Sequence, residues 1–381
     1  MERLEADQPR EAAMILAEIL SRNPDLVRVR LELARAYFVS EQWARARSEF
    51  LSVLSSGDIP ELVRQNILRF LRAIDARRGF DWDADFSLVR LGATRNYASN
   101  TLNLNLGGAT LPFTLNRDNE SVIGLGFSLN LSRREELPFL SGSRYGALGF
   151  ARIFANGETG RFFAGGENDR KSEHDDISFG AEVGMRFVWP TSSITVAPSV
   201  RRRIVEKTTQ EDRVGARVTF LQRDSHGTTY SFSPAWYDIN SPRDDSRDGR
   251  TLTLSASLNY SITPRASLGA QLYFEDRDAD SLFDDYKRSR LTAYGGFDAG
   301  FGIGLQPSAY IERRTFDQDS LLYGGLDELN FGMGLTIDSS RIILPNGFTP
   351  YIRLGLDRIG SSVEAFSYWE PYGTIGLERH F

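Results

Sequence analysis

Segments in which apolar and polar residues alternate constrain this chain more than any other feature. The clearest runs from Thr251 to Ile262, where every second residue is apolar and those between are Thr, Ser or Asn. Residues 177–189 and 329–338 repeat the pattern. Successive side chains of a β-strand point to opposite faces, so each segment predicts a strand with one apolar and one polar face. The apolar face could line a soluble core or face lipid in a membrane barrel.

The number and length of these segments favour the barrel. Most exceed the ~9–11 residues that cross a bilayer as a tilted strand, and an even number is typical of single-chain bacterial barrels. We count fourteen strand candidates, at 84–97, 121–133, 144–155, 176–189, 193–206, 211–223, 228–239, 250–262, 266–276, 288–301, 306–316, 327–339, 349–359 and 367–381. Residues 79–381 are therefore predicted to form a mainly β domain, a 14-stranded antiparallel transmembrane β-barrel. A large soluble β-structure is the alternative.

The connections between the candidates alternate in length. Those at 98–120, 156–175 and 277–287 are long and polar, whereas 190–192 and 263–265 are short. Outer-membrane barrels join their strands by short periplasmic turns and long outer loops. This alternation predicts a barrel that lies in outer-membrane lipid of a Gram-negative bacterium.

The first and last strands must meet to close such a barrel. The last candidate carries Ile375, Leu377 and the terminal Phe381, which resemble the C-terminal signal read by the outer-membrane assembly machinery. A weak seam could open laterally for a folding strand, but the sequence shows no decisive feature there.

Residues 1–78 predict four helices instead of strands, because their apolar residues follow a helical spacing. Shifting the sequence by 34 residues places Ala12 on Ala46 and Leu20 on Leu54. A 34-residue period of helix–turn–helix units is typical of tetratricopeptide repeats, whose concave surface binds proteins. A plain helical bundle is the alternative. The candidates for packing or protein binding are Leu33, Ala34, Tyr37, Phe38, Trp43 and Phe50.

Strand parity places charged side chains inside the predicted barrel. The lumen candidates are Glu182, Arg186, Arg201, Arg203, Arg217 and Glu378. Such residues either form ion pairs that hold the wall or a charge ladder that guides a passing molecule. We expect Asp284 and Asp285, in an outer loop, to be solvated charges. Phe and Tyr are expected mostly on the lipid-facing side of the strands.

Composition excludes several classes of function. The chain has no Cys, three His without metal-ligand spacing, and a net charge of −6. No phosphate-binding GxxxxGK[ST] motif and no grouping of Ser, His and Asp that indicates a hydrolase occur in it. We therefore expect no enzyme, no catalytic residue, no cofactor, no metal site and no nucleic-acid partner.

Three segments resemble one family, the surface lipoprotein assembly modulators or Slam proteins. Residues 23–38 (NPDLVRVRLELARAYF) look like its tetratricopeptide region, and residues 59–78 (IPELVRQNILRFLRAIDARR) like its link into the barrel. Residues 86–100, which end in Tyr-Ala-Ser-Asn, look like its barrel start. The layout of a helical domain followed by fourteen strands matches the family throughout. Family members often carry a longer helical domain than this one.

The resemblance implies an outer-membrane conduit that assists translocation of surface lipoproteins, or of related secreted haem- and metal-acquisition proteins. It implies a monomer with its helical domain in the periplasm, and a cargo protein, periplasmic chaperones and the assembly machinery as partners. The first repeat begins with its second helix, so we expect further residues, including a signal peptide, before Met1. Two alternatives are a polysaccharide-export porin with tetratricopeptides and a general porin or receptor.

Overall fold

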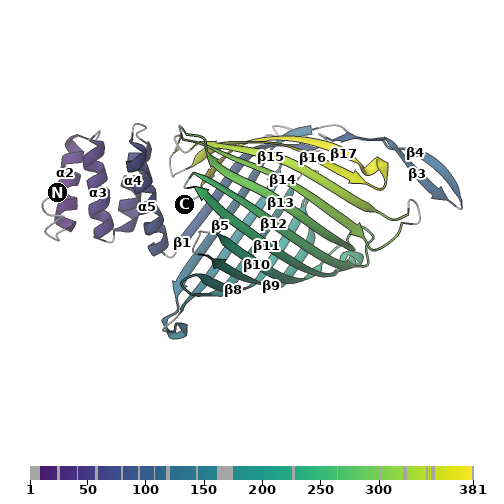
Figure 1. Cartoon of the computed structure of the whole chain (residues 1–381), viewed down its shortest axis with the longest axis horizontal. Helices are drawn as coiled ribbons and strands as arrows, with labels where there is room; N and C mark the ends of the chain where they lie inside the picture. Colours follow the sequence, from purple (N-terminus) through teal and green to yellow (C-terminus); the bar gives the residue numbers. More distant parts are fainter. Residues whose placement is uncertain are drawn as a thin grey trace.

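The computed structural model contains a closed β-barrel preceded by helices (Figure 1). It describes residues 9–379 except 24–25, 41, 56–58, 79, 93–94, 107, 117–120, 143–144, 161–174, 225–227, 264, 301, 321–323, 340–341, 343 and 345–347. The barrel strands are β1 (Phe80–Gly92), β5 (Ser121–Glu136), β6 (Gly146–Thr159), β7 (Asp176–Val188), β8 (Ser192–Val205), β9 (Thr208–Arg223), β10 (Thr229–Asn240), β11 (Gly249–Thr263), β12 (Ala266–Ala279), β13 (Tyr286–Asp298), β14 (Ile303–Phe316), β15 (Asp327–Ser339), β16 (Thr349–Ser361) and β17 (Tyr368–Arg379).

These fourteen strands confirm the predicted 14-stranded antiparallel barrel. Each pairs with the next along the chain, and β1 closes the ring by pairing with β17. Alternation has the expected physical result, because apolar side chains such as Val183, Leu272 and Met333 are about 60% exposed on the outer surface, as a lipid-facing surface requires. Their polar neighbours along the strands point into the lumen.

The outer connections include a tight turn, whose short length the candidate strands 193–206 and 211–223 already implied, and a hairpin that was not predicted. The connection between β8 and β9 is short, because Glu206 and Lys207 have φ of 50° and 67° and turn the chain tightly. Positive φ at both positions suits the right-handed twist of a hairpin. The predicted loop 98–120 contains a hairpin of β3 (Thr101–Leu106) and β4 (Ala109–Thr114), after the short β2 (Asn96–Tyr97). The hairpin projects from the barrel end opposite the helices (Figure 1).

The helical region contains four described helices: α2 (Pro9–Arg22), α3 (Val27–Val39), α4 (Trp43–Ser55) and α5 (Glu61–Arg78). Ala46, Phe50, Leu54 and Leu71 are among the residues that form one fully buried core between α3, α4 and α5. The 34-residue equivalence breaks at Ile19, which is 38% exposed while its equivalent Val53 is buried. None of these helices is long and apolar enough to cross a membrane.

The last helix leads directly to the barrel. Helix α5 ends at Arg78, and β1 begins at Phe80. Arg64 and Leu68 of α5 line a cavity of about 510 Å³ together with the adjoining ends of β13 and β14. The helical region therefore lies against the rim that carries the short connections (Figure 1).

Phe50 allows a test of the helical core. Because its side chain is fully buried and its ring stacks on Phe70 at 5.0 Å, we expect Phe50→Ala to destabilise the helical region by ~3–5 kcal/mol. The barrel should stay intact. Thermal unfolding followed by circular dichroism at helical and strand wavelengths would measure both. Met14→Ala, at a side chain that is 66% exposed, is the control and should change neither transition; equal effects would contradict the assigned core.

Candidate functional site

The lumen wall formed by β6 to β9 carries the densest group of charged side chains predicted from the sequence. Glu182 lies between two arginines of neighbouring strands, with Arg152 Nη1 at 3.5 Å from its Oε2 and Arg217 Nη2 at 3.5 Å from its Oε1. Its side chain is 8% exposed. Arg217 also donates to the Tyr237 hydroxyl at 3.3 Å. Removing the acid would leave two guanidinium groups next to each other, so Glu182 holds this part of the wall together.

Glu182→Gln should destabilise the barrel by ~1–2 kcal/mol, because it removes the charge of a buried acid whose two arginine partners are partly exposed to solvent. The matched control is Glu158→Gln on β6, whose side chain is exposed on the same lumen surface. It removes the same charge and should change stability by less than ~0.5 kcal/mol. Urea unfolding of the two variants in detergent gives the comparison. Equal loss in both would mean that overall lumen charge matters and the Glu182 contacts do not.

The remaining lumen candidates lie along the same surface. Arg203 contacts Asp176 through two hydrogen bonds, of 3.0 and 2.6 Å, and Arg186 donates to the Ser193 hydroxyl at 3.1 Å. Arg201 lines a lumen pocket of about 430 Å³. The pocket is also lined by Arg152, Arg213 and Arg217, with Glu182 as the one acidic residue, and by polar residues of β8 to β12. This part of the wall therefore presents excess positive charge to the lumen.

The wall formed by β17 and β1 carries acidic side chains. Glu378, the sixth candidate, is 9% exposed on β17, the last strand. Glu370 on the same strand pairs with Arg95 at 3.5 Å, and Asp85 of β1 accepts a hydrogen bond from the Tyr351 hydroxyl at 3.1 Å. The structure therefore does not bring Glu378 together with the other five candidates, which lie on β7 to β9. The lumen therefore has a basic part on β6 to β9 and an acidic part on β17 and β1.

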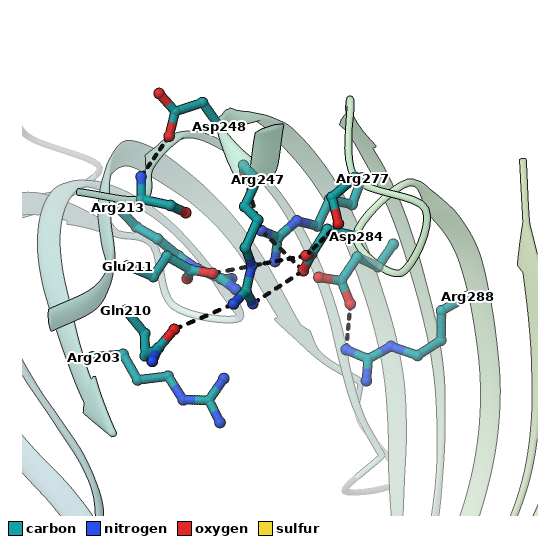
Figure 2. Close-up of polar contacts among 12 residues, drawn as sticks. Arg203, Gln210, Glu211, Arg213, Arg247, Asp248, Arg277, Asp284 and Arg288 are labelled. Carbon is teal, nitrogen blue, oxygen red and sulfur yellow. Dashed lines mark hydrogen bonds and ion pairs between the residues drawn. The ribbon is translucent and has the colours of Figure 1, made fainter. Parts of the chain in front are cut away.

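An ion cluster at the outer end of the lumen was not foreseen from the sequence. Figure 2 shows Arg277 at its centre, with Nη1 at 3.2 Å from Glu211 and Nη2 at 3.4 Å from Asp284. Arg247, from the β10–β11 connection, contacts Asp284 at 2.8 Å and Gln210 at 3.2 Å. Two outer loops are thereby fixed to the strand wall.

The expectation that Asp284 is a solvated loop charge is wrong. The residue is 9% exposed, because two arginines and the Ser281 hydroxyl surround its carboxylate. Strand parity could have indicated Glu211, which lies on the lumen face of β9 opposite Arg203. No periodicity applies to Arg247 and Asp284, since both lie in loops.

The expectation that tyrosines mostly face lipid is also wrong. Tyr237, Tyr273, Tyr286, Tyr294, Tyr310, Tyr351, Tyr368 and Tyr372 have the lumen-facing parity of their strands. Guanidinium groups cover several of their rings: Arg290 lies 4.3 Å from the Tyr310 centroid, and Arg288, Arg314 and Arg353 lie 5.0–5.2 Å from those of Tyr273, Tyr286 and Tyr351. These tyrosine faces are occupied by cation–π contacts.

The remaining sequence candidates lie outside the lumen. Leu33, Ala34 and Phe50 are buried in the helical region, and Tyr37, Phe38 and Trp43 pack against its cores. Ile375 and Leu377 face outward, 62% and 36% exposed, whereas Phe381 lies outside the described residues. Among the residues the structure describes, no three His, Cys, Asp or Glu side chains are arranged to hold a metal ion.

Comparisons with known proteins point to one family. The family model described as "Surface lipoprotein assembly modifier" matches residues 157–381, and a tetratricopeptide repeat model matches residues 3–58. A curated protein of Moraxella catarrhalis, named "Surface lipoprotein assembly modifier", is 22% identical over 84% of this chain. The chain covers 60% of that relative's length.

Solved outer-membrane proteins have a similar barrel. A loop-deletion mutant of OmpT from Vibrio cholerae gives a TM-score of 0.42 at 10% identity, covering 79% of this chain and 99% of that one. A bacterial polysaccharide outer membrane secretin gives 0.40 at 11% identity, covering 79% and 98%. Likeness at this level carries no information about function.

Proposed function

Because the chain belongs to the surface lipoprotein assembly modifier family, we propose that it is a conduit that assists the passage of lipoproteins across the outer membrane to the cell surface. The observation that carries the proposal is the family match over residues 157–381, which include the strands from β7 to β17. The chain is an outer-membrane β-barrel protein. Its cargo is a lipoprotein or a related secreted protein, with proteins of haem or metal acquisition as the specific class.

The charges of the lumen suit a polypeptide that passes through it. Glu182, Arg186, Arg201, Arg203 and Arg217 project from β7 to β9, and Glu378 belongs to the acidic part of the lumen on β17 and β1. An unfolded chain carries both signs of charge, so a lumen with a basic and an acidic side can contact it without binding it tightly. We assign these six residues to guiding the cargo.

The helical region supplies the entry side in this proposal. It lies against the rim with the short connections, which face the periplasm in outer-membrane barrels. There it receives cargo from periplasmic chaperones. The sequence contains no GxxxxGK[ST] motif for nucleotide binding. Folding of the cargo outside the cell therefore drives its passage through the barrel. The protein acts as a monomer that the outer-membrane assembly machinery inserts.

A polysaccharide-export porin is the second candidate, and the lumenal tyrosines are the observation that favours it. Sugars stack on open aromatic faces, but arginines cover the rings of Tyr273, Tyr310 and Tyr351. A protein conduit does not need open aromatic rings in its lumen. The covered rings therefore favour the conduit over the polysaccharide porin.

Deletion of the gene in its own bacterium tests the proposal without a choice of cargo. Surface lipoproteins would be labelled on intact cells with a membrane-impermeant biotin reagent and quantified. We expect at least one lipoprotein to lose ten-fold or more of its surface label while its total amount stays constant, and the restored gene to recover it. Unchanged labelling of every lipoprotein would overturn the proposal. Loss of capsular polysaccharide from the surface would indicate the export porin, and an altered small-solute uptake alone would indicate a general porin.

A further inference from the structure

The lumen pocket beside Arg201 has the size of a ligand site. Its volume is about 430 Å³, and side chains from β6 to β12 line it. Small-molecule sites in proteins have volumes of about 300–1,000 Å³ and contain a few convergent polar groups. The pocket therefore has room for a small organic molecule, and its lining decides which kind.

Two glycines give the pocket its depth. A Cβ atom at Gly180 of β7 would lie 2.6 Å from the ring of Phe154, and one at Gly215 of β9 would lie 2.6 Å from the ring of Tyr237. Both rings line the pocket and lie against the backbone of these glycines. The wall therefore has a flat aromatic floor at this place.

Four arginines line the pocket, and three of them have acidic partners. Glu182 lies 3.5 Å from both Arg152 and Arg217. Glu211 contacts Arg213. Four guanidinium groups are thus matched by two carboxylates, which leaves two positive charges around the pocket without an acid.

Arg201 is the fourth of these arginines. Within the part of the chain that the structure describes, its side chain forms no hydrogen bond and no ion pair. It lies directly opposite Arg213 in the register of β8 with β9, at a Cα separation of roughly 4.5–5.5 Å for such pairs. Like charges directly opposite each other destabilise a sheet. A negatively charged group between the two guanidinium groups would remove this repulsion.

The neutral polar residues of the pocket suit an oxyanion. Ser199 of β8 and Thr253 of β11 line it, and their hydroxyls form no hydrogen bond with other described residues. Guanidinium groups bind carboxylate and phosphate oxygens through paired hydrogen bonds. A phosphate monoester has a charge of about −1.5 to −2 at pH 7 and three acceptor oxygens, so it matches two unpaired positive charges better than a single carboxylate does.

We infer that the lumen pocket is a binding site for a small phosphate monoester. Arg201 and Arg213 bind the phosphate oxygens from two neighbouring strands. Ser199 and Thr253 donate further hydrogen bonds, and the organic part of the ligand lies against the ring of Phe154. The inference goes beyond the proposed function and does not rest on it, since the folded barrel binds this ligand without cargo.

Calorimetric titration of the purified protein in detergent with glycerol phosphate, at constant ionic strength, tests the site. Arg201→Gln should weaken binding at least ten-fold, because it removes one of the two guanidinium groups. Arg353→Gln is the matched control, since it removes the same charge from an exposed side chain on the lumen face of β16, outside the pocket. It should change the affinity less than two-fold. Equal weakening in both variants, or no binding by the wild-type protein, would overturn the inference.

Thermal unfolding gives a readout that a purely structural role of Arg201 would not produce. Without ligand, Arg201→Gln should unfold at a higher temperature than the wild-type protein, because the repulsion with Arg213 is gone. Saturating glycerol phosphate should raise the unfolding temperature of the wild-type protein and leave that of the variant unchanged. A ligand-free variant that unfolds at a lower temperature would show that Arg201 stabilises the wall itself, and would overturn the inference.

An acidic segment of a polypeptide offers anionic oxygens too, and a capped diglutamate peptide is the probe for that source. We expect the peptide to bind at least ten-fold more weakly than glycerol phosphate, because each carboxylate has one charge and two oxygens. Tighter binding of the peptide would make the pocket a carboxylate site and overturn the assignment to phosphate. Neither result changes the proposed function, which the surface labelling of the deletion strain tests separately.

Discussion

Replacing Gly215 with valine is expected to prevent assembly of the barrel. A Cβ atom at this position of β9 would lie 2.0 Å from the carbonyl oxygen of Trp236 on β10, and 2.8 Å from the Tyr237 Cα. Both are backbone atoms in a paired strand, so they cannot move aside without breaking the pairing of β9 with β10. The clash should cost more than ~4–5 kcal/mol, a large part of the stability of an ordinary fold.

The amount of protein in the outer membrane and its heat-modifiable migration on gels measure this effect. Gly146→Val is the matched control, since a Cβ on that strand residue meets nothing within 4 Å. We expect a near-complete loss of folded barrel for Gly215→Val and near-normal amounts for Gly146→Val. A folded Gly215→Val barrel would contradict the close approach of β9 and β10.

Asp284→Asn should release the outer loops without unfolding the barrel. It removes the ion pairs of Asp284 with Arg247 and Arg277 while Arg277 keeps its contact with Glu211. Loss of one partner of a buried pair costs ~3–5 kcal/mol, and ~1.4 kcal/mol corresponds to a factor of ten in population. The open form of the 241–248 loop should therefore become roughly a hundred-fold more populated or more.

Trypsin added to intact cells reports this opening, because Arg243 and Arg247 are cleavage sites within the loop. When opening and closing are fast, the cleavage rate follows the population of the open form. The control is Asp280→Asn. Asp280 is exposed and lies in the β12–β13 connection, as Asp284 does, and its replacement should not speed cleavage of the 241–248 loop. Equal rates for the two variants would show that the cluster in Figure 2 does not hold the loops.

The alternation of apolar and polar residues along each strand made the barrel and much of its lumen predictable. Within a strand, the position of a residue decides which face of the sheet its side chain points to. The side chains of Glu182, Arg186 and Arg217 could therefore be assigned to the lumen without knowledge of the neighbouring strands. The partners could not be assigned in the same way. The contact of Glu182 with Arg152 depends on the register between β6 and β7, which tertiary structure determines.

Features outside regular strands were not predictable from the sequence. Arg247 and Asp284 lie 37 residues apart in two loops and meet only because β11 and β12 pair in the observed register. The hairpin from Thr101 to Thr114 was missed, although Leu102 and Leu104 alternate with asparagine, because it lies beyond the barrel wall.

The central claim is that cargo passes through the lumen, and photo-crosslinking in living cells tests it most directly. A photoreactive amino acid would replace Ser199, which lines the lumen pocket, or Val200, which is 51% exposed on the lipid side of the same strand. The cargo probe is the lipoprotein identified by the deletion experiment. The account predicts adducts between the cargo and position 199 during translocation, and none from position 200. Cargo that reaches the surface without any adduct at position 199, while position 200 or neither position reacts, would contradict it.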